Sequence, residues 1–173
     1  MLQMTRLNFS LPGSWNDADM LQLCTFGEGR TPGNAGMTMA EYRAHYSVWA
    51  VLASPLLLSA DVRTIKAKHP ECLKLMLNGE IIAVNQDPAG LAPLLVSQTT
   101  NMTAARLASH DEPTSSDITA QVFARPLHGG DIAVVFLNRG EAPTTLSVSW
   151  RALGLKEGQA MAVRDVEFSS TGR

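Results

Sequence analysis

Residues 12–20 hold the side chains with the clearest chemical potential in this chain. Trp15, Asp17 and Asp19 lie within five residues, immediately before an apolar stretch. Alternate side chains of an extended strand share a face, so we expect these three side chains to point the same way. The flat ring could cover the apolar C–H face of a sugar, while the carboxylates could accept hydrogen bonds from its hydroxyls. The alternative is a polar turn in which the aspartates cap neighbouring backbone amides.

The composition limits the kinds of protein that this chain can be. A length of 173 residues predicts one domain or two small ones, and 45% apolar with 17% charged residues indicates a folded globular chain. The net charge of −2 provides no basic surface, which argues against a nucleic-acid partner. No apolar run reaches the roughly 18 residues that cross a bilayer, so we expect no membrane partner. Residues 1–10 lack a basic start followed by an apolar block, so we expect no signal peptide.

The cysteines and histidines form no reactive or metal-binding pattern. Cys24 and Cys72 are too few for a disulfide framework and lack metal-ligand spacing. They are either two buried thiols, which is the preferred interpretation, or a single bridge. His45 and His69 have no partner at the spacing of a catalytic triad, so we assign both of them structural roles. We therefore expect no metal and no cofactor.

The first half of the chain reads as a mixture of helices and strands that would position the aspartates. Thr38 and Glu41 form a capping box, and apolar residues follow at helical spacing, which predicts a helix over residues 39–54. Pro55 is expected to end this helix. Residues 56–61 are predicted to form a short, fully buried strand with a polar end.

Two further elements continue this alternation. Residues 70–78 predict a short helix with Gly79 as its C-cap, and residues 81–87 are another apolar run. Three successive elements then end in polar side chains, namely Asp17 and Asp19, then Asp61, then residues 85–87. Buried parallel strands with polar C-terminal ends are typical of a (β/α)8 barrel, whose active site lies at that face. The alternative is that each polar residue caps the following helix.

The second half of the chain is predicted to be almost wholly β. Strand-like runs cover residues 94–99, 120–127, 131–138, 144–150 and 161–166. Gly129 and Gly130 separate two of these runs as a hairpin turn. Phe123 and Phe136 occur in alternating patterns and are predicted to be core residues, so no exposed aromatic platform is expected. This half is therefore predicted to be a small antiparallel β domain.

Several motifs occur in the order and at the spacing of a known family. In the first half they are Trp15-Asn-Asp-x-Asp-Met-Leu21, Gly36-Met-Thr-x-x-Glu-Tyr-Arg-Ala-His45, Trp49-Ala, Ala53-Ser-Pro-Leu-Leu57 and Ile82-Ala-Val-Asn-Gln-Asp87. In the second half they are Val122-Phe-Ala-Arg-Pro-Leu127, Ala133-Val-Val-Phe-Leu-Asn-Arg139, Trp150-Arg-Ala-Leu-Gly-Leu155 and Val163-Arg-Asp-Val166. Over nearly its whole length, the chain resembles the second half of glycoside hydrolase family 27, the family of α-galactosidases and α-N-acetylgalactosaminidases.

The resemblance implies a retaining α-glycosidase built as a (β/α)8 barrel followed by an antiparallel β-sandwich. Residues 1–90 would be the last βα units of the barrel, and residues 91–173 a truncated β-sandwich. Such enzymes use two carboxylates about 5 Å apart, one as nucleophile and one as acid/base. In this family they belong to a Lys-Tyr-Asp strand motif and to an Arg-x-x-x-Asp motif well before the Trp-Asn-Asp segment, and this sequence contains neither. The resemblance therefore assigns no catalytic residue to this chain.

Part of the family's sugar pocket does carry over to this sequence. Asp19 and Met20 match positions that line the galactose site, where the aspartate would accept a hydroxyl hydrogen bond and the methionine would pack against an apolar face. Trp15 and Asp17 would support this pocket. The implied ligand is an α-galactoside or related glycan, and the implied further partner is the missing barrel half or a second copy. The family is usually lysosomal or secreted, and the localisation of this chain stays open.

The sequence departs from the family pattern at several places. Ala18 stands where proline is usual, and Glu167 replaces a tryptophan. Residues 24–32 resemble an insertion, which would be an inert surface loop or a segment that reshapes leaving-group selection. The final strands of the β domain are expected to be absent. We expect residues 1–11 to have no counterpart in the family. This segment would then be either a new N-terminus or an artefact of the gene model.

Three functional hypotheses follow from the sequence. The first is an α-galactosidase-type hydrolase present as a fragment that is inactive alone. The second uses Asp17 and Asp19 as a catalytic pair, although retaining chemistry needs carboxylates that flank the scissile bond from two directions. The third is a non-catalytic carbohydrate-binding or assembly module, which exposed aromatic residues on the β domain would favour. The choice between galactose and N-acetylgalactosamine and the preferred aglycone stay open.

Overall fold

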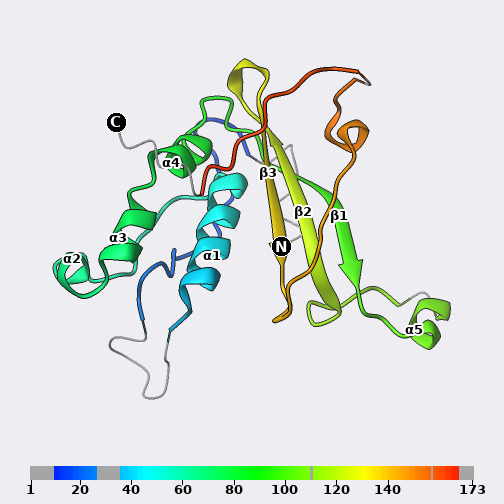
Figure 1. The fold of residues 1–173 in the computed structure, drawn as a ribbon, viewed down its shortest axis with the longest axis horizontal. Coiled ribbons are helices and arrows are strands. Elements are labelled where there is room, and N and C mark those ends of the chain that lie inside the picture. The colour runs from blue at the N-terminus through cyan, green and yellow to red at the C-terminus, as the bar shows by residue number, and fades with distance from the viewer. Residues whose placement is uncertain (1–9, 27–35, 110, 157, 168–173) are drawn as a thin grey trace.

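The computed structural model describes residues 10–26, 36–109, 111–156 and 158–167. Four helices come first, and a three-stranded antiparallel sheet in the order β1–β2–β3 follows. The elements are α1 (Met39–Leu52), α2 (Ile65–Lys68), α3 (Pro70–Met76), α4 (Gly79–Asn85), β1 (Leu94–Thr100), α5 (Ala104–Ala108), β2 (Ile118–Pro126) and β3 (Ile132–Asn138), with short 3-10 helices at His128–Gly130 and Trp150–Leu153. Helix α1 lies between α4 and the sheet and contacts both of them (Figure 1). Among the described helices, none is long and apolar enough to cross a bilayer.

Helix α1 forms as its capping box predicts. The Thr38 hydroxyl accepts a hydrogen bond from the Glu41 amide at 3.3 Å, and the Glu41 carboxylate accepts one from the Thr38 amide at 2.7 Å. The bond from the Thr38 amide, followed by one that the Thr38 hydroxyl donates to the same carboxylate at 2.9 Å, lowers the pKa of the Glu41 carboxyl. The helix is confirmed from its first residue, but it ends at Leu52, two residues before the predicted end, because Ala53 adopts a left-handed cap with φ of 54°.

The predicted strand at residues 56–61 is wrong in its burial and its length. The structure has only a parallel bridge between Leu21 and Leu58, in which the Leu21 amide donates to the Leu57 carbonyl at 2.9 Å. The side chains of Leu57 and Leu58 are 49% and 41% exposed. A parallel strand is buried when neighbouring strands and helices cover it on all sides, and within the described residues this segment pairs with one neighbour only.

The run at residues 81–87 belongs mostly to a helix and not to a strand. The Asn78 side chain accepts hydrogen bonds from the amides of Glu80 and Ile81 at 3.0 and 3.2 Å, which starts α4 at Gly79. Gly79 is therefore the first residue of a helix and not the C-cap of the preceding one, which ends at Met76. Ile81 and Asn85, one helical turn apart, form the buried side of α4.

Three of the five predicted strands are present in the sheet, and the hairpin turn between β2 and β3 is confirmed. Residues 144–150 and 161–166 are not strands. The first run leads into a 3-10 helix because the Ser149 side chain accepts a hydrogen bond from the Ala152 amide at 3.2 Å. The second run returns to the helices, where the Asn78 side chain donates to the Val166 carbonyl at 2.9 Å and Glu167 accepts from Ser47 at 2.6 Å.

One face of the sheet is fixed to the helices through Arg125 on β2. Its Nη1 donates to the carbonyls of Ala50 and Val84 at 3.2 and 2.7 Å, near the C-terminal ends of α1 and α4. This guanidinium is fully buried, and burial lowers its pKa. At the adjoining turn, the carboxylate oxygens of Asp87 accept hydrogen bonds from the His128 amide, both at 3.0 Å.

The two predicted core aromatics of the sheet have different environments. Phe123 shares a face with Arg125 and is only 1% exposed, as predicted. Phe136 lies opposite Val122, on the face that points away from α1, and its side chain is 48% exposed. The prediction that Phe136 is a core residue is therefore wrong, because the described residues cover this face of the sheet only in part.

Candidate functional site

The segment that contains the two aspartates is a compact turn and not an extended strand. Leu11 and Ser14 exchange two backbone hydrogen bonds of 2.8 Å, which closes a loop immediately before Trp15. The Asp17 carboxylate then accepts a hydrogen bond from the Asp19 amide at 2.8 Å. Asp19 itself has a φ of 70°, in the left-handed region that Asp tolerates better than most residues. The prediction that alternate side chains share one strand face is therefore wrong at Asp19.

This turn contains the four side chains that the sequence analysis selected. Trp15, Asp17, Asp19 and Met20 are all exposed, with Trp15 at 46% and Met20 at 40%. Each aspartate uses one oxygen locally, since Oδ1 of Asp19 accepts from the Met20 amide at 2.7 Å. Within the described part of the chain, the second carboxylate oxygens of Asp17 and Asp19 make no hydrogen bond. Both carboxylates can therefore accept further hydrogen bonds from a ligand.

The turn is supported from behind by a buried polar contact. The Ser54 hydroxyl donates to the Asn16 carbonyl at 3.1 Å, and the Asn85 side chain donates to the Ser54 carbonyl at 2.8 Å. Ser54 is fully buried and Asn85 is 7% exposed. Asn85 thus supports the turn from the C-terminal end of α4 and is not one of three polar strand ends at a common face.

Asp61 and Asp87, the carboxylates of the other predicted polar ends, contact other parts of the chain. Asp61 accepts two hydrogen bonds of 2.9 Å from the Arg63 guanidinium, which lowers its pKa to about 2. No hydrogen bond or ion pair among the described residues joins Asp61 to Asp19. Asp87 contacts the turn between β2 and β3, as described above. Of the predicted carboxylates, the structure groups only Asp17 and Asp19.

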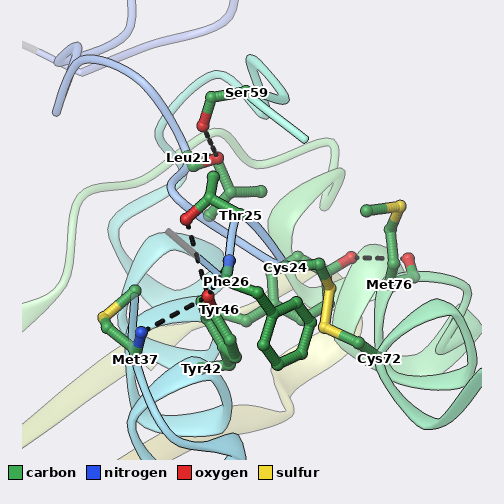
Figure 2. Close-up of a disulfide and its surroundings, with 10 residues drawn as sticks. All are labelled: Leu21, Cys24, Thr25, Phe26, Met37, Tyr42, Tyr46, Ser59, Cys72 and Met76. Atoms are coloured by element: carbon green, nitrogen blue, oxygen red, sulfur yellow. Dashed lines mark hydrogen bonds between the residues drawn. A yellow bond between two sulfur atoms is a disulfide. The ribbon is translucent and has the colours of Figure 1, made fainter. Parts of the chain in front are cut away.

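The chain that leaves the turn is anchored at several points (Figure 2). Leu21 and Leu23 are fully buried, and Cys24 forms a disulfide with Cys72 of α3. The preferred prediction of two buried thiols is therefore wrong. Both residues do lie in the hydrophobic core, but their Cα atoms are 5.9 Å apart, which is the usual separation for a disulfide.

The Tyr42 hydroxyl fixes both ends of the segment that follows Cys24. It accepts hydrogen bonds from the amides of Phe26 at 2.7 Å and Met37 at 3.4 Å, as Figure 2 shows. The Phe26 ring also stacks on the His69 ring, with their centroids 3.7 Å apart. Residues 27–32 of the predicted insertion lie outside the described residues. The sequence places Tyr42 in the apolar stripe of the helix and in one of the family motifs, and neither indicates its role as an acceptor.

Each of the two histidines contacts an aromatic ring, His45 that of Trp49 and His69 that of Phe26. The His45 ring lies against the Trp49 ring with centroids 4.0 Å apart, and its Nε2 accepts a hydrogen bond from the Gln22 amide at 3.0 Å. Burial lowers the pKa of this imidazole. Among the described residues, no three His, Cys, Asp or Glu side chains form a cluster that could hold a metal ion.

Helices beside a parallel bridge, followed by an antiparallel sheet, correspond to the end of a (β/α)8 barrel joined to a β-sandwich. Residues 2–87 match the family model described as "Alpha galactosidase A", and residues 117–166 match "Alpha galactosidase C-terminal beta sandwich domain". The chain belongs to the α-galactosidase family of glycoside hydrolases and corresponds to the C-terminal part of its members. The resemblance identified from the sequence motifs is confirmed, whereas the prediction that residues 1–11 have no counterpart in the family is wrong, because the match begins at residue 2.

Individual relatives support this assignment. Alpha-galactosidase 3 of Arabidopsis thaliana is 37% identical over 155 residues, which cover 90% of this chain and 29% of that protein. Alpha-N-acetylgalactosaminidase of Gallus gallus is 33% identical over 159 residues, covering 91% of this chain and 32% of that protein. The crystal structure of alpha-galactosidase I from Mortierella vinacea matches with a TM-score of 0.58 and 30% identity, covering 82% of this chain and 28% of that one. The chain thus spans less than a third of the length of each.

Proposed function

We propose that this chain contributes part of the galactose site of a retaining α-galactosidase and does not hydrolyse galactosides by itself. The exposed turn at residues 15–20 supports this proposal most directly. It lies within the region that matches the family, and it presents two carboxylates and a methionine to solvent. We further propose residues 1–90 as the barrel portion and residues 91–173 as the β domain, joined through Arg125.

Each residue of the turn has a distinct role in this proposal. Asp19 uses Oδ1 on the Met20 amide, so its second oxygen accepts a hydrogen bond from a sugar hydroxyl. The exposed side chain of Met20 packs against an apolar face of the sugar ring. Asp17 holds the Asp19 amide, and Trp15 borders the turn, so both of them support the pocket.

The same geometry argues against a catalytic pair within the turn. Retaining hydrolysis needs a nucleophile and an acid/base that flank the scissile bond about 5 Å apart. Asp17 and Asp19 are two residues apart in one turn, and each accepts a hydrogen bond from a backbone amide of that turn, so no second element places one carboxylate across a sugar from the other. We therefore propose that the nucleophile and the acid/base belong to the part of the family fold that this chain does not span.

One observation favours a second candidate, a carbohydrate-binding module without catalytic activity. Phe136 and Trp150 are 48% and 55% exposed on the β half of the chain, although sequence patterns placed Phe136 in the core. Exposed aromatic rings can cover the C–H faces of sugars. If this module binds a sugar, substitution of Phe136 by alanine weakens binding, whereas substitution of Asp19 has no effect.

The test uses the 173-residue chain and an Asp19→Asn variant. Asparagine keeps Oδ1 for the Met20 amide, so the turn persists and only the second carboxylate oxygen and its charge are lost. We expect no turnover of 4-nitrophenyl α-D-galactoside and weaker galactose binding by the variant. The loss should be about tenfold or more, since a hydrogen bond to a charged group contributes about 1.5–3 kcal/mol. Asp17→Asn is the matched control, because it changes the same charge beside the same turn.

The outcomes separate the parts of the proposal. Turnover that Asp19→Asn abolishes would refute the claim that the chain lacks a catalytic carboxylate. Equal affinities of the Asp19→Asn and wild-type chains for galactose would refute the role of Asp19. A parallel titration with N-acetylgalactosamine shows which of the two sugars the turn prefers.

A further inference from the structure

The extended segment that follows the turn at residues 15–20 has one edge whose amides are bonded to side chains. Successive residues of a strand direct their backbone groups to opposite edges. The Leu21 amide and carbonyl bond to the neighbouring segment, at 2.9 Å to the Leu57 carbonyl and 3.3 Å to the Ser59 amide. The amides on the other edge belong to Met20 and Gln22. Both amides are taken by side chains, the first by Asp19 and the second by His45 Nε2 at 3.0 Å.

The bond to Gln22 depends on the protonation state of His45. Nε2 accepts a hydrogen bond from the Gln22 amide, so it carries no proton itself, and the proton of the neutral ring is on Nδ1. An imidazolium has two N–H donors and no acceptor, so uptake of a solvent proton at Nε2 breaks this bond. His45 is half-buried against the Trp49 ring, an environment that favours the neutral form.

The charged groups around His45 are few. The facing segment carries Asp17 and Asp19, and its cysteine, Cys24, is in the disulfide and does not titrate. The charged residues on α1 and on the elements packed against it are Glu41 and Arg43 on α1, Glu80 on α4, Arg125 on β2 and Glu167, which accepts a hydrogen bond from Ser47 of α1. None of these groups shifts the pKa of His45, which burial alone lowers.

We propose that His45 is a positioning residue for the pocket: its neutral imidazole holds residues 20–23 in place, and its protonation releases them. This proposal rests on the proposed role of Asp19 and Met20 in sugar binding. Gln22 is two residues beyond Met20, and the bond from His45 is the contact that fixes this edge from α1. Acidification below the range in which the imidazole is neutral therefore loosens the sugar-binding turn and weakens galactose binding.

The test follows backbone amides by nitrogen-15 NMR in the full chain between pH 7.5 and pH 5. We expect the hydrogen-exchange protection of the Gln22 amide, corrected for its intrinsic rate, to fall up to about tenfold as His45 titrates, as expected for loss of one hydrogen bond. The chemical shift of the Met20 amide should change over the same pH range. The Leu21 amide is the internal control, because its partner is a carbonyl that does not titrate.

Two variants separate positioning from simple packing. His45→Gln provides an amide oxygen at similar reach that does not titrate, so Gln22 protection should become independent of pH. His45→Phe keeps a ring against Trp49 but removes the acceptor, so Gln22 protection should be low at both pH values. The proposal would be overturned if the protection of the wild-type Gln22 amide did not change with pH. It would also be overturned if the chemical shift of the Met20 amide did not change as His45 titrates.

Galactose binding distinguishes this proposal from the proposed function. Suppose that the protection of the Gln22 amide and the chemical shift of the Met20 amide follow the titration of His45, but galactose does not bind at any pH. The positioning role of His45 then stands, and the proposed sugar site fails. If galactose binds with the same affinity at pH 5 and pH 7.5, the sugar site stands and the positioning role of His45 fails. In His45→Gln, the affinity for galactose should be the same at both pH values.

Discussion

Loss of the Cys24–Cys72 disulfide should destabilise this chain strongly. The two cysteines are 48 residues apart in the sequence. A cross-link removes loop-closure entropy from the unfolded chain, and a loop of this length corresponds to about 4 kcal/mol at about 25 °C. The free energy of unfolding of a typical domain is about 5–15 kcal/mol, so this bond accounts for a large share of that stability. It is also the covalent connection between α3 and the segment that follows the turn at residues 15–20.

Substitution and reduction test this value in different ways. In the Cys24→Ala/Cys72→Ala double variant the cross-link and two buried sulfur atoms are lost, so packing adds to the effect. Alanine is preferable to serine, because a hydroxyl in this core would need a hydrogen-bond partner. Reduction of the wild-type chain removes the cross-link and keeps both sulfurs. The difference between the oxidised and reduced wild-type chains is therefore the cleaner measure of chain entropy.

Urea unfolding followed by circular dichroism gives the required free energies. With an m-value of about 2 kcal/mol/M, a loss of about 4 kcal/mol lowers the unfolding midpoint by about 2 M. Thiol titration of the denatured oxidised chain should detect no free cysteine, since both are in the disulfide. Each single alanine variant breaks the same bond, so the double variant should be hardly less stable than either. A difference below about 1 kcal/mol between oxidised and reduced chains, or additive single effects, would refute the reasoning.

Two further predictions concern packing and charge. Gly90 and Gly13 both have positive φ, but a Cβ on Gly90 would lie 2.8 Å from Cδ of Pro12, whereas one on Gly13 meets nothing within 4 Å. Gly90→Ala should therefore lower the free energy of unfolding by about 1 kcal/mol or more beyond Gly13→Ala, and equal losses in urea unfolding would contradict this packing. The hydrogen bond from the Thr114 side chain, followed by that from Arg106, lowers the pKa of Asp117 to about 2, so its stabilisation is present above about pH 4 and is lost as the pH falls towards 2. Asp117→Asn should flatten this part of the pH dependence of the urea midpoint, and an unchanged slope would show that other carboxylates cause it.

The sequence predicted α1 well because the signals for this helix are local. Thr38 and Glu41 cap each other within one turn, and this pairing does not depend on the rest of the fold. The end of the helix was harder to predict. Pro55 indicates a stop in its neighbourhood, but the left-handed residue that ends the helix is Ala53, a type with no preference for that conformation.

Residues 81–87 show the limit of periodicity in short apolar runs. Such a run fits a buried strand or one side of a short helix equally well. The deciding contacts come from the Asn78 side chain, which caps the amides of Glu80 and Ile81. The glycine that follows Asn78 was read as the end of one helix, although it is the start of the next.

Errors in predicted burial have a non-local cause. Alternation along a strand shows which side chains share a face, but not what covers that face. Leu57, Leu58 and Phe136 are apolar residues in well-patterned runs, and all three are exposed because the described residues cover their surroundings only in part. Composition and pattern therefore predicted the elements of the β half better than the environment of their side chains.

The conformation of the candidate site was mispredicted from the sequence. The sequence pattern predicted that Trp15, Asp17 and Asp19 lie on one face of a strand. The structure instead has a turn at these residues, in which Asp19 is left-handed. The alternative that the aspartates cap backbone amides is correct. Capping and sugar binding are compatible, because each carboxylate has two oxygens and the turn uses one of them.

The shape of this turn is set by contacts behind it and not by strands on its open side. Ser54 holds the Asn16 carbonyl, His45 holds the Gln22 amide, and the disulfide holds Cys24. Of these three anchors, Ser54 directly follows the C-terminal end of α1, His45 lies in the middle of α1, and Cys72, the disulfide partner of Cys24, lies in α3. None of them uses the side chains that would contact a sugar, so substitutions at the anchors and at Asp19 should have separable effects. The turn at residues 15–20 can therefore keep its geometry in this chain without contacts on its open side.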